Sequence, residues 1–183
     1  VLQAPAVSAP EPESDSLVHL KWQQARSVSG ATFRLQVPEG ALYDDCDLRI
    51  RVRETDSLHL SPLYTFGDET IPLERSASLS LRAAHIPKSL RGKVYIAGFT
   101  HRGKILAFGG RYKDGMITAA IPAFGRYTLM ADTTAPTILP VPEMACDTCR
   151  AGQPLGFRIT DSGSGISRFT GKIDNAWALF VYD

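Results

Sequence analysis

Several features that identify common protein classes are missing from this sequence. Its 183 residues contain no apolar run near the roughly 20 residues that cross a membrane, so we expect no membrane span. Lysine and arginine total 20 against 19 acidic residues, a formal net charge of +1, and this balance does not favour a nucleic-acid partner. The sequence begins at Val1, without a methionine or a basic leader segment, which suggests a mature or excised part of a longer protein.

The sequence also lacks the residue spacings of common catalytic sites. Zinc hydrolases place histidines and carboxylates a few residues apart, whereas the four histidines of this chain are scattered singly. They are His19, His59, His85 and His101. A Gly-x-Ser-x-Gly nucleophile turn is absent as well. We therefore predict no catalytic residue, no metal ligand and no cofactor in this chain, which we do not expect to be an enzyme.

Cysteine is scarce, with three residues in all. Cys146 and Cys149 form a Cys-x-x-Cys pair, but structural zinc needs a second such pair, and a thioredoxin-like site needs a helix start. In an oxidising compartment a local disulfide between Cys146 and Cys149 is the leading prediction, with Cys46 free. Free thiols, or a cross-link to Cys46, remain as alternatives.

The pattern that is present is an alternation of apolar and polar residues, which is typical of strands with one buried face. Turn signals such as Arg91-Gly92 and Asp114-Gly115 separate these runs, and a helical turn is expected only within residues 84–90. The runs lie at residues 32–37, 47–53, 79–83, 94–97 and 126–130. Many short strands with frequent turns predict an all-β protein, an antiparallel β-sandwich.

Composition divides the chain into three parts. Residues 1–16 are proline-spaced and predict an extended linker. Residues 17–131 form the predicted sandwich. The sequence Asp132-Thr-Thr-Ala-Pro136 then opens a second module, residues 132–183, with strands expected at 154–159, at 166–173 and around Trp177. About 50 residues are too few for an independent sandwich, so either strands are missing beyond Asp183 or this module leans on the first. We expect the former, a truncated module.

Three further features of the sequence invite functional interpretation. The turn at Asp161-Ser-Gly-Ser-Gly165 lacks the carboxylates of a calcium loop and the lysine of a phosphate loop, so we interpret it as a tight turn. The arginines of residues 49–53 share one face, and we expect them to be solvated and ion-paired. Trp22 and Trp177 could stack on sugars, but core packing is the favoured interpretation.

Four stretches, in order, carry a family resemblance. They are Leu35-Gln-Val-Pro-Glu-Gly-Ala-Leu-Tyr-Asp-Asp45, Ser61-Pro-Leu-Tyr64, the stretch from Phe124 to Thr137, and the stretch from Asp161 to Asp183. Together they resemble the non-catalytic C-terminal region of lysostaphin/LytM-type murein zinc metallopeptidases of Gram-negative bacteria. The resemblance implies immunoglobulin-like modules and a periplasmic or extracellular location.

The same resemblance implies an accessory role. A zinc peptidase domain upstream of Val1 would be the partner, with zinc held there and not in this chain, whose sequence lacks the family's His-x3-Asp and His-x-His. The alternative hypothesis is a stand-alone module that binds cell-wall glycan (peptidoglycan) or a surface protein. Its candidate contacts are the aromatic side chains of Tyr43, Tyr64 and Tyr112.

Overall fold

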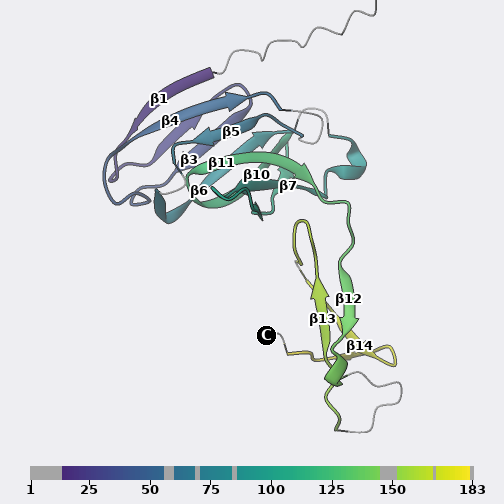
Figure 1. Ribbon diagram of the computed structural model, residues 1–183. Coiled ribbons are helices and arrows are strands. Elements are labelled where there is room, and N and C mark those ends of the chain that lie inside the picture. Colours follow the sequence, from purple (N-terminus) through teal and green to yellow (C-terminus); the bar gives the residue numbers. More distant parts are fainter. Residues whose placement is uncertain are drawn as a thin grey trace, which may run out of the picture. The chain divides into compact units, whose positions relative to one another are not determined.

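The computed structural model describes residues 14–55, 60–68, 71–83, 86–144, 152–166 and 168–181. These residues form strands and two short 3-10 turns, which confirms the all-β prediction (Figure 1). The chain divides into two compact units, the first ending at Asp132 and the second beginning at Thr133. This division lies within one residue of the boundary expected from the sequence. Each unit is described by itself.

The first unit is an antiparallel β-sandwich of two sheets. Sheet A has six strands in the order β1-β4-β5-β11-β7-β8: β1 (Ser14–Leu20), β4 (Cys46–Arg53), β5 (Leu63–Phe66), β11 (Gly125–Ala131), β7 (Val94–Phe99) and β8 (Ile105–Ala107). Sheet B has five strands in the order β2-β3-β6-β10-β9: β2 (Arg26–Ser29), β3 (Phe33–Val37), β6 (Pro72–Arg82), β10 (Met116–Ala123) and β9 (Arg111–Lys113). Because β1 begins at Ser14, the predicted linker, residues 1–16, extends too far toward the C-terminus. Residues 14–16 belong to sheet A.

Alternation along the strands builds the core between the sheets. In β3 the side chains of Phe33, Leu35 and Val37 are buried and their neighbours are exposed. In β4 Leu48 and Ile50 are buried on the face opposite the arginines. Each such side chain contributes about 1.5–3 kcal/mol through the hydrophobic effect. The predicted inner faces of these two strands are therefore confirmed.

Aromatic rings fill the centre of this core. The rings of Phe33 and Phe66 meet edge to face, with centroids 5.3 Å apart, and the ring of Tyr64 packs against both. Tyr127 joins them from β11, and its hydroxyl donates a hydrogen bond to the carbonyl of Ala123 at 2.6 Å. Edge-to-face pairs add about 0.5–1.5 kcal/mol beyond the area that they bury.

The turns follow the local sequence. Asp114 and Gly115 have φ values of 51° and 78° and close the two-residue hairpin between β9 and β10, the geometry that an Asp-Gly pair favours. The one helical turn expected in this unit is present as the 3-10 turn η1 (Lys88–Leu90).

The second unit contains two separate two-stranded sheets. β12 (Thr137–Pro140) pairs with β13 (Phe157–Thr160), and β14 (Gly171–Ile173) pairs with β15 (Ala176–Ala178), while η2 (Pro142–Met144) is a 3-10 turn. The strands predicted at 154–159 and 166–173 are thus shorter and begin later than expected.

The turn at Asp161 is confirmed. Its carboxylate accepts hydrogen bonds from the backbone N–H groups of Gly163 and Gly165, at 2.8 and 2.9 Å. Gly165 has a φ of 84°, a conformation that glycine adopts without a steric penalty.

The core role predicted for Trp177 is wrong. Its side chain is 69% exposed, and Leu179 and Val181 are more exposed still. The partly buried side chains of this stretch are those of Ala178 and Phe180, on the opposite alternation, and the ring centroid of Phe180 lies 6.3 Å from that of Phe157. Trp177, Leu179 and Val181 therefore mark the exposed face of this stretch, and the side that packs is the opposite one.

Candidate binding surface

The predicted cysteine site lies mostly outside the described residues, since Cys146 and Cys149 are not among them. Cys46 is partly buried at the start of β4, and its thiol is free. Burial, followed by the nearby carboxylates of Asp47 and Asp45, raises the pKa of the Cys46 thiol. A thiol of this kind is mainly protonated near neutral pH and therefore a weak nucleophile.

The three candidate tyrosines occupy different environments. Tyr64 is fully buried in the aromatic core, so its ring does not reach a surface ligand. The ring of Tyr112 packs partly against the core, and the guanidinium of Arg91 lies 4.8 Å from its centroid. Tyr43 is 67% exposed, and its hydroxyl donates a hydrogen bond to Glu74, which raises the pKa of the Tyr43 phenol. Only Tyr43 presents an open aromatic surface.

Trp22 lies in the loop next to that of Tyr43. The backbone N–H of Trp22 donates to the Asp45 carboxylate at 3.0 Å, and its carbonyl accepts from the N–H of Gly40 at 2.9 Å. Trp22 is 42% exposed, against the core packing expected for it. The two loops thus form an aromatic edge of the first unit.

The arginine stripe of β4 is ion-paired, as predicted. The Nε atoms of Arg49 and Arg51 lie 3.8 and 3.5 Å from the two carboxylate oxygens of Asp15. Asp15 comes from β1, the neighbouring strand, and not from the acidic residues near the stripe in sequence. This face of sheet A therefore carries partly neutralised positive charge.

The two described histidines lie apart. His19 is placed between carboxylates, with Nδ1 2.8 Å from Asp47 and Nε2 3.8 Å from Asp45. His101 lines a small hollow of about 280 Å³ together with Asp68 and Arg126. Among the described residues, no three histidine, cysteine, aspartate or glutamate side chains come together as metal ligands would. His59 and His85 lie outside the described residues.

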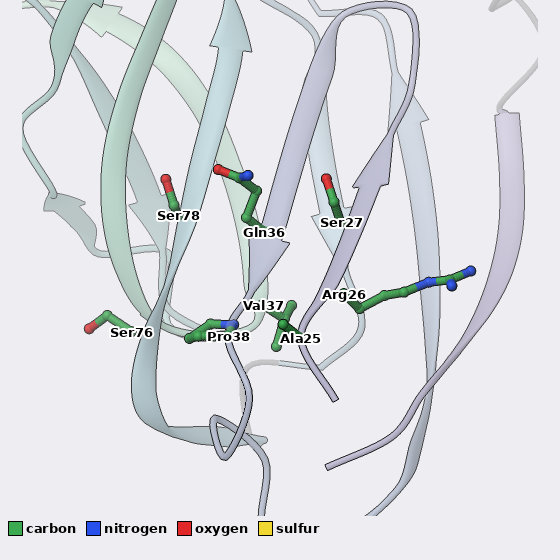
Figure 2. A pocket seen from close by; sticks show the side chains of 8 residues that line it. All are labelled: Ala25, Arg26, Ser27, Gln36, Val37, Pro38, Ser76 and Ser78. Carbon is green, nitrogen blue, oxygen red and sulfur yellow. The ribbon is translucent and has the colours of Figure 1, made fainter. Parts of the chain in front are cut away.

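The larger hollow, of about 530 Å³, lies on the outer face of sheet B. Figure 2 shows Gln36 between Ser27 and Ser78, on three neighbouring strands, while Arg26 extends away from them. The lining residues are Ala25, Arg26, Ser27, Gln36, Val37, Pro38, Ser76 and Ser78. Hydroxyl, amide and guanidinium groups make hydrogen bonds with a ligand and do not act as acid–base pairs on their own.

A second row of polar residues adjoins this hollow. The hydroxyls of Ser80 and Thr118 lie 2.7 Å apart, on β6 and β10. Sequence reasoning did not single out these residues. The signal was nevertheless present, because serines at 76, 78 and 80 alternate with the buried side chains of Ala77, Leu79 and Leu81.

A comparison with known protein families identifies the family of the first unit. The profile of the Zu5-like domain matches residues 18–132, which is more than half of the chain and nearly all of the sandwich. The chain belongs to the Zu5-like domain family. No curated protein matches it.

The Zu5-like domain runs from within β1 to the residue after β11, so it contains both sheets, both hollows and all three candidate tyrosines. The resemblance of the whole chain to murein peptidases stays a prediction. No helix among the described residues has the length and apolar content to cross a membrane.

Proposed function

We propose that the chain is a non-catalytic binding module whose Zu5-like domain holds an extended polypeptide on the outer face of sheet B. The observation that carries this proposal is the 530 Å³ hollow lined by serine hydroxyls and the Gln36 amide. These groups both donate and accept hydrogen bonds, so they match the N–H and C=O groups of a peptide backbone.

The spacing of the outer residues also suits an extended chain. Residues two apart on a strand, such as Ser78 and Ser80, lie about 7 Å apart on one face. An extended ligand repeats its side chains at the same interval. A small molecule, in contrast, is usually enclosed by a concave pocket that buries most of its surface.

Site-specific photocross-linking tests this proposal. A photoreactive phenylalanine analogue at Gln36, in the full-length protein in its native cells, is expected to give one adduct, whose partner peptide is identified by mass spectrometry. The same analogue at Lys172, an exposed position on β14, is the control and is expected to give none. Equal labelling at both positions, or none at Gln36, would overturn the proposal.

A blocking variant sharpens the test. Ser78→Trp places an indole in the hollow next to Gln36 and is expected to abolish the adduct. Thr160→Trp, at an exposed position on β13, is the matched control and should leave it unchanged.

The wider context remains the one predicted from sequence, an accessory region beside a zinc peptidase domain in the cell envelope. Its support is the ordered set of four stretches described above. Reading the coding sequence upstream of Val1 tests it, because the resemblance requires His-x3-Asp and His-x-His there. An upstream sequence without both signatures contradicts this context and leaves the binding proposal standing.

The aromatic edge favours a second candidate function, recognition of cell-wall glycan. Trp22 and Tyr43 are exposed on adjacent loops, and aromatic faces suit sugar rings. Sedimentation with purified peptidoglycan is expected to be lost in Trp22→Ala and Tyr43→Ala. Trp177→Ala, which removes an exposed indole from the second unit, is the control. Equal sedimentation of all three variants refutes this function.

A further inference from the structure

Positive charge is concentrated in one part of a nearly neutral chain. Between residues 71 and 131 lysine and arginine outnumber aspartate and glutamate ten to two, although the formal net charge of the whole chain is +1. This region supplies β6, β9 and β10, three of the five strands of sheet B. The register of these strands decides where the cations lie.

The register brings four cations to the outer face of sheet B. One row across the sheet reads Arg34, Ser80, Thr118 and Arg111. The next row reads Arg82, Met116 and Lys113. Their buried neighbours along the strands face the core, so all four cations point outward, and all four are exposed.

These four cations lie close together, and we call them the cationic strip: Arg34, Arg82, Arg111 and Lys113. Neighbouring strands lie about 4.8 Å apart, which places the backbones of Arg82 and Lys113 about 10 Å apart across β10. Arg34 and Arg82 are diagonal neighbours on β3 and β6, about 7–8 Å apart. The hydrogen-bonded hydroxyls of Ser80 and Thr118 form the floor between them.

Within the described part of the chain, no member of the cationic strip has a carboxylate at ion-pair distance. The contrast with sheet A is direct, since Arg49 and Arg51 there share Asp15. Glu54 and Arg82 both influence the Tyr64 phenol, in opposite directions, but they form no ion pair with each other. Among the described residues, the charge of the strip is therefore not offset by an ion pair.

We infer that the polypeptide bound by sheet B is acidic, with its carboxylates on the cationic strip and its neutral part in the adjoining hollow. This inference rests on the proposed function and names the partner class. The rows of Ser27–Gln36–Ser78 and of Arg34–Ser80–Thr118 are neighbours in the register, so one extended segment can contact both. Guanidinium groups are suited to carboxylates because they can donate two parallel hydrogen bonds.

Other anionic partners fit this face less well. Single-stranded nucleic acid is usually held by aromatic side chains that stack on its bases, and neither row of the strip contains an aromatic residue. A membrane surface is usually engaged by large apolar side chains beside the cations, and Met116, the one large apolar residue in the two rows, is only partly exposed.

The test uses a fluorescein-labelled peptide of alternating glutamate and serine, with its binding to the whole chain measured by anisotropy at low and at physiological ionic strength. The triple variant Arg34→Gln/Arg82→Gln/Lys113→Gln is expected to raise Kd about tenfold, since each exposed charge pair contributes a few tenths of a kcal/mol to 1 kcal/mol. The control Lys21→Gln/Arg158→Gln/Lys172→Gln removes the same charge elsewhere and should change Kd by less than about twofold.

Two results would overturn the inference. The first is equal affinity for a peptide of alternating glutamine and serine, because binding would then not depend on the carboxylates. The second is tighter binding to phosphatidylserine vesicles or to a single-stranded oligonucleotide, lost in the same triple variant, which assigns the strip to those partners. If the triple variant unfolds, Arg34→Gln/Lys113→Gln replaces it and should raise Kd for the acidic peptide about fivefold, and an unchanged Kd refutes the inference.

The cross-linking and peptide-binding experiments together distinguish failure of this inference from failure of the proposed function. An adduct at Gln36 without binding of the acidic peptide leaves the function and refutes the acidic partner. Binding of the acidic peptide without an adduct refutes the function in cells.

Discussion

Replacing Gly98 by alanine is expected to destabilise the first unit by about 1–3 kcal/mol, the usual cost of overpacking a core. A Cβ at this position would lie 2.6 Å from Cε2 of Phe108 and 3.0 Å from Cε1 of Tyr127. These two rings pack edge to face with their centroids 5.7 Å apart, and the Tyr127 hydroxyl donates a hydrogen bond to the Ala123 carbonyl. Neither ring can withdraw without loss of one of these contacts.

Thermal unfolding followed by near-ultraviolet circular dichroism measures this effect. For a domain of this size, about 1 kcal/mol corresponds to about 4 °C, so Tm should fall by about 4–12 °C. Gly92→Ala is the matched control, because a Cβ there has no atom within 4 Å and no positive φ, and it should leave Tm unchanged or slightly raised.

A double-mutant cycle identifies the cause. Phe108→Leu removes the closer ring, so the added cost of Gly98→Ala should shrink in that background. If Gly98→Ala matches wild type within about 0.5 kcal/mol, or if Gly92→Ala costs as much, the steric reasoning is wrong.

Three further predictions concern single side chains. Ser61→Ala removes the oxygen that accepts the buried N–H of Leu129 at 2.9 Å, so urea unfolding should show a loss of about 1–3 kcal/mol, and a loss below about 0.5 kcal/mol contradicts this. Burial raises the pKa of the Tyr64 phenol above its ordinary value of 10.0, so the phenol of the unfolded chain loses its proton at a lower pH than that of the folded chain. Stability should therefore fall as pH rises above about 10, and Tyr64→Phe should lose less stability than wild type between pH 8 and pH 11. The raised pKa of the Cys46 thiol predicts slower alkylation by iodoacetamide at pH 8 than for a free cysteine peptide, measured by mass spectrometry of the Cys46 peptide; an equal rate refutes it.

Local pattern was sufficient to predict the inner faces of β3 and β4. Each strand alternates strictly, and a shift of one residue would turn Leu35 or Ile50 toward water, so the sequence permits one orientation. The Asp-Gly pair at 114–115 was equally informative, because positive φ at both positions suits few other dipeptides.

Contacts between distant strands could not be predicted in the same way. Asp15 lies in a stretch whose prolines favoured a linker, yet pairing of β1 with β4 places it beside Arg49 and Arg51. The same limit applies to the cationic strip, whose members come from β3, β6 and β9 and meet only through the strand order. Composition gave a net charge near zero because the acidic residues are concentrated elsewhere in the chain.

The two units show why alternation alone does not determine burial. Phe33, Leu35 and Val37 alternate and are buried because sheet A lies opposite sheet B and supplies a second apolar layer. Trp177, Leu179 and Val181 alternate in the same way and are exposed, because the other layer lies on the opposite side of this stretch, where the ring of Phe180 packs against that of Phe157. A strand requires a local pattern, whereas a core requires a facing layer, and the second condition is set by chain segments far away in sequence.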